Sequence, residues 1–146
     1  MKSLLHWSSA IALIAVAVMM LAVYGNRGQW GQAVVVAAIL LAAAWLLSPL
    51  FGGRQSPWSA LRQDQEREPG VVIFWRPGCV YCMRMMASLG RTRRKAQWVN
   101  IWRDAEAASF VREHNDGNET VPTVILRDGV YTNPDPETVR RELVRG

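Results

Sequence analysis

Residues 71–82 read VVIFWRPGCVYC, and this stretch decides the fold of the second half of the chain. Its first five residues form a continuous apolar run rich in β-branched side chains, which is typical of a strand buried on both faces. From Cys79 to Leu89 the sequence contains no proline or glycine, so we expect a helix that ends at Gly90. The two cysteines of the chain therefore stand where a buried strand gives way to a helix.

The residues that follow continue this alternation of strands and helices. Asp128-Gly129 is a hairpin-turn signal, and Asp135-Pro136-Glu137 carries an N-cap, a first-turn proline and an acidic residue, so it opens a helix. The predicted elements after Gly90 are strands at 97–101, 121–126 and 130–132 and helices at 105–114 and from Asp135 onward. The order is βαβαββα, the minimal thioredoxin-like arrangement of an α/β domain, and we place that domain at residues 70–146.

The spacing of Cys79 and Cys82 indicates redox chemistry. Two thiols separated by two residues on one helical turn can close a disulfide with little backbone movement. Cys79 falls at the predicted helix N-terminus, where unpaired N–H groups and the helix dipole favour a negative charge. Arg76 and Arg84 add positive potential. We therefore expect Cys79 to be the attacking thiolate and Cys82, one turn inside, to be the less exposed resolving thiol.

Two other interpretations of the pair stay open. Buried cysteines can be ordinary small apolar residues, although the junction position of this pair argues against that role. The helix also carries Met83, Met85 and Met86, and thiolate with thioether ligands selects Cu(I), so a membrane-tethered metal-binding module is an alternative. Helical spacing instead places Cys82, Met86 and Leu89 on one core-facing stripe, which favours packing and predicts no metal.

Two segments resemble a known family. Cys79-Val80-Tyr81-Cys82 resembles the C-x-Y-C motif of dithiol glutaredoxins, and Thr120-Val121-Pro122 resembles the segment that faces the active site in that family. The stretch from Asp104 to Pro134 is similar to the mycoredoxins, glutaredoxin-like reductases of actinobacteria. The resemblance covers about residues 71–145.

The resemblance implies a glutaredoxin fold in which Pro122 is cis and the backbone at Val121 pairs with a bound thiol. It implies that the catalytic residues are Cys79 and Cys82 and that the substrate-binding residues are Arg76, Tyr81, Thr120, Val121 and Pro122. It also implies a low-molecular-weight thiol, mycothiol, as electron donor with no tightly bound cofactor. The protein partners would be oxidised or S-thiolated proteins.

The sequence departs from the family at two places. Val80 replaces the glycine or proline that usually stands between the two cysteines, which should change the redox potential. The Gly-Gly-x-Asp type of site for a thiol carboxylate is absent, with Tyr131-Thr132-Asn133-Pro134-Asp135 in its place. This second departure weakens the case for glutathione as the donor.

Charge divides the 146-residue chain into two parts. The net charge is +5, but all 12 acidic residues lie after position 63, and residues 1–53 carry only Lys2 and Arg27 as fixed side-chain charges. Two apolar stretches, residues 4–24 and 33–50, are each long enough to cross the roughly 30 Å hydrocarbon core of a bilayer. We therefore expect a two-helix transmembrane hairpin at residues 1–51. Two cysteines are too few for a disulfide-stapled scaffold, and the apolar content excludes a disordered chain.

The basic residues around the two spans indicate an orientation. Lys2 precedes the first span, Arg54, Arg62 and Arg67 follow the second, and the turn holds only Arg27. The positive-inside bias places both ends, and the redox domain, on the cytoplasmic side of the cell membrane. The alternatives are a cleaved signal peptide, for which no Ala-x-Ala-like site is visible, and an inverted topology, which would make the protein an extracytoplasmic disulfide-handling enzyme.

The remaining charged segments are given no catalytic role. Residues 52–69 are a juxtamembrane linker, and a short helix on the lipid surface or a solvated spacer both fit them; we favour the spacer. Residues 91–95 read RTRRK, which fits a solvated loop better than a lipid contact. No recognition motif accompanies these charges, so we expect no nucleic-acid partner. His114 has no catalytic partner in the sequence.

The sequence predicts a membrane-anchored, glutaredoxin-type thiol–disulfide oxidoreductase.

Overall fold

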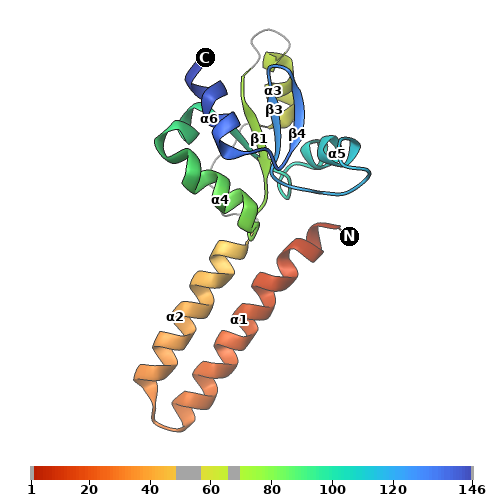
Figure 1. Cartoon of the computed structure of the whole chain (residues 1–146). Helices are drawn as coiled ribbons and strands as arrows, with labels where there is room; N and C mark the ends of the chain where they lie inside the picture. Colours follow the sequence, from red (N-terminus) through yellow and green to blue (C-terminus); the bar gives the residue numbers. More distant parts are fainter. Residues whose placement is uncertain (1, 49–56, 66–69, 146) are drawn as a thin grey trace. The chain divides into compact units, whose positions relative to one another are not determined.

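The computed structural model describes residues 2–48, 57–65 and 70–145, in two compact units, Met1–Phe51 and Gly52–Gly146. The first unit is a hairpin of two helices, α1 (Lys2–Asn26) and α2 (Trp30–Leu47), drawn in red and orange in Figure 1. The predicted apolar stretches leave eight residues, 25–32, for the turn, but in the structure only residues 27–29 separate the two helices. The turn is this tight because Gly28 adopts a left-handed φ of 74° and its N–H donates to the carbonyl of Gly25. Pro49, Leu50 and Phe51, the predicted end of the second span, lie outside the described residues.

Small residues fill the contact between α1 and α2, and large apolar residues point away from it. Among residues 7–48, whose burial the structure describes, the buried residues are Ser48 and five alanines, namely Ala10, Ala17, Ala33, Ala37 and Ala44. Small side chains let two helices approach closely, which is how helices associate in a membrane. The large apolar side chains of both helices are mostly exposed, with Val18 at 62% and Ile39 at 64%. The unit is therefore apolar on its outside.

The second unit contains a four-stranded mixed sheet in the order β2-β1-β3-β4. Strand β1 pairs in parallel with β2 and antiparallel with β3, and β3 pairs antiparallel with β4. The elements in chain order are α3 (Trp58–Gln65), β1 (Val72–Trp75), α4 (Val80–Leu89), the 3-10 helix η1 (Gly90–Lys95), β2 (Gln97–Asn100), α5 (Ala105–Glu113), β3 (Thr123–Leu126), β4 (Gly129–Thr132) and α6 (Pro136–Arg145). From β1 onward this order confirms the predicted βαβαββα fold of a glutaredoxin-like domain.

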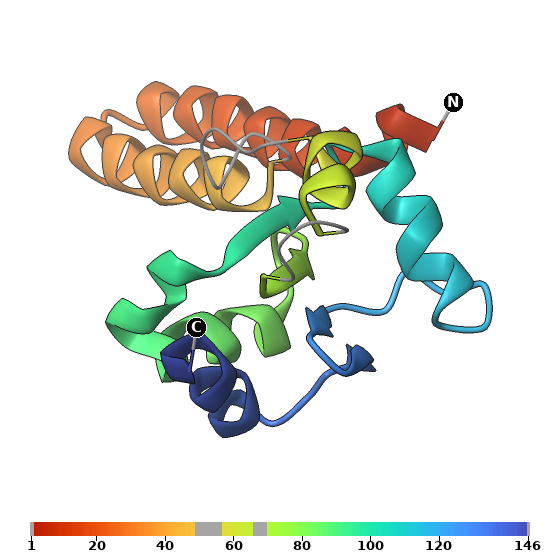
Figure 2. The same ribbon diagram turned by 90° about the horizontal axis from the view of Figure 1, so that it is seen from above.

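Helices cover both faces of this sheet. Helices α4 and α6 lie on one face, and α3 and α5 lie on the other (Figures 1 and 2). Ile73 belongs to the core under α4 and α6, with Met85, Leu89, Val124 and Val139. Phe74, the next residue of β1, packs against the aromatic rings on the α3 and α5 face. This double burial explains why the sequence of β1 is continuously apolar.

The solvated spacer expected before β1 is wrong where the structure describes it. Residues 58–65 form α3, whose Trp58 is 3% exposed and whose Leu61 is 8% exposed. The Trp58 ring lies 5.0 Å from Phe74 and 4.9 Å from Phe110. Because two apolar side chains one turn apart find a ready apolar surface, this segment folds onto the domain. Residues 52–56 and 66–69 of the predicted linker lie outside the described residues.

Two smaller expectations about the α4 region also need correction. Met85, not Met86, joins Cys82 and Leu89 in the buried stripe of α4, because a helix brings both the third and the fourth following residue near the same face and Met85 is the one turned inward. The basic loop after Gly90 is the 3-10 helix η1, which Thr92 stabilises by donating a hydrogen bond to the carbonyl of Leu89. Its Arg91, Arg93, Arg94 and Lys95 are exposed, as expected for a solvent-facing run.

Candidate active site

Cys79 occupies the N-cap position of α4. Its backbone is extended (φ −81°, ψ 108°), and its Sγ accepts a hydrogen bond from the backbone N–H of Cys82 at 3.2 Å. Gly78 precedes it with a left-handed φ of 74°, a conformation that suits glycine and turns the chain from β1 into the helix. An unpaired helix N–H therefore already points at the sulfur of Cys79, where it would stabilise a thiolate.

Cys82 lies one turn inside the same helix and is fully buried. Burial raises the pKa of the Cys82 thiol far above its ordinary value, and its hydrogen bond with Cys79 raises that pKa further. Both cysteines are free thiols in this structure. Both cysteines are buried residues, but Cys79, at 9% exposed, caps the N-terminal end of the helix, whereas Cys82, at 0% exposed, keeps its proton at neutral pH.

The segment around Pro122 lies directly against Cys79. The thiol of Cys79 donates to the carbonyl oxygen of Val121 at 3.3 Å, and the Val121-Pro122 peptide bond is cis, as the resemblance implied. The carbonyl of Pro122 in turn accepts the backbone N–H of Asn133 at 2.7 Å. These contacts hold the start of β3 beside the nucleophile.

Asn115 supports this segment, a role that the sequence did not predict. Its side-chain amide donates to the carbonyl of Val111 at 2.7 Å and to the hydroxyl of Thr123 at 3.1 Å. Its amide oxygen accepts the hydroxyl of Thr132, and the Thr123 hydroxyl donates to the carbonyl of Thr120 at 2.8 Å. One asparagine thereby connects α5, β3 and β4. A polar residue at the end of a predicted helix gave no signal of this role, because all of its partners lie elsewhere in the sequence or in the backbone.

A pocket of about 590 Å³ opens beside Cys79. Four of the predicted substrate-binding residues line it with Cys79: Arg76, Tyr81, Thr120 and Val121. Pro122, the fifth, is fully buried behind the lining. Val80 also lines the pocket and is 75% exposed, so the unusual residue between the cysteines presents an apolar side chain to any incoming substrate. Asn118 and Glu119 form part of the wall and were not predicted.

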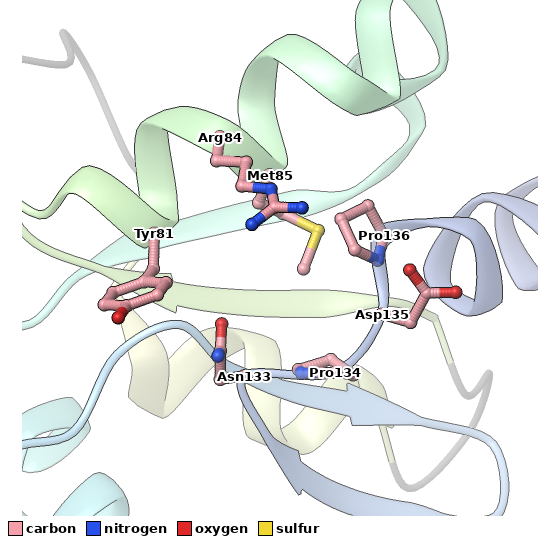
Figure 3. Close-up of a pocket in the computed structure, with 7 residues that line it drawn as sticks. All are labelled: Tyr81, Arg84, Met85, Asn133, Pro134, Asp135 and Pro136. Carbon is pink, nitrogen blue, oxygen red and sulfur yellow. The ribbon is translucent and has the colours of Figure 1, made fainter.

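A second pocket, of about 290 Å³, lies on the α6 side of Tyr81. Tyr81, Arg84 and Met85 project from α4 toward the segment at residues 133–136 that leads into α6 (Figure 3). Asn133 in that segment has a left-handed φ of 48°. Because Tyr81 lines both pockets, they are neighbouring parts of one surface at the N-terminal end of α4. The guanidinium of Arg84, the amide of Asn133 and the carboxylate of Asp135 give this part its polar groups.

The structure also shows where the candidate ligands of the metal-binding alternative lie. Within residues 2–48, 57–65 and 70–145, no group of three or more His, Cys, Asp or Glu side chains lies close enough together to hold a metal ion. Met85 packs in the core, whereas Met83 is 49% exposed. His114 lies at the end of α5, where its ring packs 4.2 Å from that of Phe110, and it does not line either pocket.

Comparison with known proteins places the site in a family context. The Glutaredoxin family model matches residues 71–131. A protein of Mycobacterium tuberculosis that carries the name glutaredoxin is 38% identical over 76 residues, which are 51% of this chain and 90% of that protein. Mycoredoxin 1 of Corynebacterium glutamicum is 35% identical over 65 residues, which are 44% of this chain and 80% of that protein. The family match begins after α1, α2 and α3.

Proposed function

Because the chain belongs to the glutaredoxin family of thiol–disulfide oxidoreductases, we propose that it is a membrane-anchored member that reduces protein mixed disulfides with mycothiol. The observation that carries this proposal is the position of Cys79, at the N-cap of α4 and against the Val121 carbonyl in an open pocket. A low-molecular-weight thiol as co-substrate and protein disulfides as targets follow from the family.

Cys79 is the nucleophile in this mechanism. Its thiolate attacks the sulfur of the small thiol in a mixed disulfide with a protein. The bond between that sulfur and the protein breaks, and the protein thiolate leaves and takes up a proton from water. Cys79 then carries the small thiol as a mixed disulfide. The helix N–H that already contacts its sulfur stabilises the thiolate before attack and when it is released again.

Two routes regenerate Cys79. A second molecule of the small thiol attacks the mixed disulfide, releases the oxidised thiol dimer and frees the Cys79 thiolate. Alternatively, Cys82 loses its proton, attacks Cys79 and expels the small thiol, which leaves a Cys79–Cys82 disulfide. Two further molecules of the small thiol then reduce this disulfide, leave as the oxidised thiol dimer and restore both protein thiols. Because burial raises the pKa of Cys82, the second route requires removal of a tightly held proton, which slows it near neutral pH.

The pockets on either side of Tyr81 supply the substrate sites. Arg76, Thr120 and Val121 bind the part of the mixed disulfide nearest to Cys79. The smaller pocket binds the polar remainder of the small thiol through Arg84, Asn133 and Asp135. Mycothiol as that thiol is supported by the similarity to mycoredoxin 1 and by the absence of a Gly-Gly-x-Asp site from residues 131–135.

The hairpin of α1 and α2 is the proposed membrane anchor. Residues Trp7–Asn26 and Trp30–Leu47 are long and apolar enough to cross a bilayer. Only 11% of an apolar 18-residue stretch in the first span, and 17% of such a stretch in the second, is buried within the protein. An outer surface made of large apolar side chains is costly in water and favourable in lipid. We assign residues 1–51 to the hairpin, 52–69 to the juxtamembrane segment and 70–146 to the redox domain.

The excess of basic residues after the second span supports a cytoplasmic redox domain. Replacing Arg27 by cysteine in a Cys79→Ser, Cys82→Ser background tests this orientation, because the turn should then react with an impermeant maleimide from outside intact cells. Labelling only after the cells are opened would invert the topology.

Trapping of the intermediate tests the mechanism and names the donor. The full chain with Cys82→Ser is incubated with a peptide whose single cysteine is joined to mycothiol, and in parallel with the same peptide joined to glutathione. We expect mass spectrometry to find one mycothiol on Cys79 and little glutathione. The matched control, Cys79→Ser, should carry neither. An unmodified Cys79 that also alkylates no faster than free cysteine would contradict the mechanism, and preferential glutathione transfer would correct the donor.

A further inference from the structure

Helix α3 is held on the redox domain by the buried ring of Trp58 and by the Asp104 carboxylate, which accepts hydrogen bonds from two helices. One oxygen of Asp104 accepts the backbone N–H groups of Glu106 and Ala107 at 3.1 and 3.0 Å and so caps α5. The other oxygen accepts the backbone N–H of Trp58 at 2.7 Å, at the first residue of α3. The indole of Trp58 is buried against Phe74 and Phe110. Helix α3, in the juxtamembrane segment, therefore packs on the redox domain, although it precedes the matched family region.

The chain enters the domain at the end of the sheet that carries the cysteines. Phe74 is the third residue of β1, and β1 leads through Trp75 and residues 76–78 directly to Cys79. Asp104 follows β2, which runs parallel to β1, so it lies at the same C-terminal end of the sheet. The opposite end is marked by Val71, whose carbonyl accepts the N–H of Gln97 where η1 passes into β2. Without α3, the chain would enter at that opposite end.

The chain between α2 and α3 is short. Residues 48–57 separate Leu47 from Trp58, and ten residues of fully extended chain span at most about 35 Å. If α3 were not docked, residues 48–70 would form the connection, more than twice as many. The docking of α3 thus shortens the tether and places its attachment point toward the end of the sheet from which β1 leads to Cys79.

From this geometry we propose that the enzyme acts on disulfides that lie close to the bilayer surface, such as juxtamembrane cysteines of membrane proteins. The inference rests on the proposed function and on the hairpin being a membrane anchor. The side chains around Cys79 agree with it: Val80, Tyr81 and Met83 are 75%, 59% and 49% exposed, and Arg76 and Arg84 stand beside them. Apolar and basic groups together suit a target segment at the interface of an anionic membrane.

The test compares the rates at which the protein reacts with probes held at two distances from a membrane surface. The full chain is reconstituted in vesicles of phosphatidylcholine and phosphatidylglycerol. The probes are lipid-anchored peptides whose single cysteine carries thionitrobenzoate, either two residues from the lipid or beyond a spacer of forty residues, and a soluble copy of the peptide. Attack by Cys79 releases the coloured thiolate and joins the peptide to Cys79, so the first turnover needs no donor thiol. We expect the near probe to react faster than the far probe.

Asp104→Asn separates the two tasks of the carboxylate. An amide oxygen still caps α5, but the amide nitrogen cannot accept the N–H of Trp58. Complete release of α3 would lower the effective concentration at the near probe as roughly the −3/2 power of tether length, a loss of about threefold in near-probe rate. Because Asp104→Asn removes one hydrogen bond and keeps the packing of Trp58, we expect a smaller loss in the same direction. Trp58→Ala should act in the same direction. Asp128→Asn is the matched control, since Asp128 accepts the Tyr131 hydroxyl in the turn before β4 and not the backbone of α3.

An insertion gives a variant that leaves the folded domain untouched. Thirteen Gly and Ser residues between Ser56 and Pro57 lengthen the tether and should lower the near-probe rate by a similar factor, again about threefold. Soluble-probe rates should stay unchanged in every variant. Equal near and far rates in the native chain, or near rates unaffected by both Asp104→Asn and the insertion, would overturn this inference alone. If the native chain reacted with none of the probes, the soluble one included, the proposed function would be overturned instead.

Discussion

The two units of this protein place their apolar side chains in opposite ways. In the hairpin, alanines are buried and large apolar side chains face outward, whereas in the redox domain Ile73, Phe74 and Val124 are fully buried. The proposed membrane location of the hairpin would explain the difference, because large apolar side chains are favourable on a surface that faces lipid and costly on a surface that faces water. The same residue type therefore has a different expected role in each unit, and its exposure alone does not show which role it has.

Truncation of a leucine in each unit is the strongest way to sharpen this contrast. Leu89→Ala removes a 2% exposed side chain from the core beneath α4 and α6, and we expect the free energy of unfolding of the redox domain to fall by about 2–5 kcal/mol. Leu46→Ala, in α2, removes a side chain that is 48% exposed and should leave that value unchanged. Alkylation of the buried Cys82 thiol in increasing urea reports unfolding of this domain in the full chain. An equal decrease in the free energy of unfolding for Leu89→Ala and Leu46→Ala would show that the two units do not unfold independently.

Replacing each of two equally exposed valines by arginine tests whether the exposed apolar side chains of the hairpin face lipid. Val18 in α1 is 62% exposed and Val144 in α6 is 63% exposed. An arginine near the middle of a span costs about 2.5–3.5 kcal/mol on insertion scales, so Val18→Arg should shift much of the protein out of the alkali-resistant membrane fraction. Val144→Arg should leave the membrane fraction and the exchange rate unchanged. Retention of Val18→Arg in the membrane at native levels would argue that α1 does not face lipid.

The sequence predicted those parts of the protein that depend on local pattern. The apolar run of β1, the helix after Cys79 and the hairpin at Asp128-Gly129 each carry their own signal, and the order of elements from β1 onward is confirmed. The position of Cys79 at the start of α4 also followed from the sequence, because a strand-to-helix junction defines a helix N-terminus.

The parts that were missed depend on contacts between distant residues. Trp58 and Leu61 look like isolated apolar residues in a polar segment, and only the aromatic face made by Phe74 and Phe110 gives them a partner. Asp104 reads as an ordinary helix cap, and its second task appears only when α3 is placed beside it. Asn115 likewise draws its role from Thr123 and Thr132. Periodicity predicts which face of an element is buried, but it does not show which other segment covers that face.

The smallest expected effect concerns the two cysteines. Burial and the hydrogen bond with Cys79 raise the pKa of Cys82, so the folded protein holds this proton more tightly than the unfolded chain does. The stability that this provides is fully present below the pKa of an unfolded cysteine, about 8.5, and is lost as pH rises above it, at about 1.4 kcal/mol per pH unit.

Urea unfolding of the reduced full chain from pH 7 to pH 10, followed by the fluorescence of its tryptophans, measures this loss. Cys82→Ala is the matched control, since it keeps a small apolar side chain in the same place and removes the titrating group. We expect the native chain to lose stability relative to Cys82→Ala as pH rises. Parallel pH profiles would show that the Cys82 thiol ionises in the folded protein as it does in the unfolded chain. They would also remove the reason for expecting attack by Cys82 on Cys79 to be slow near neutral pH.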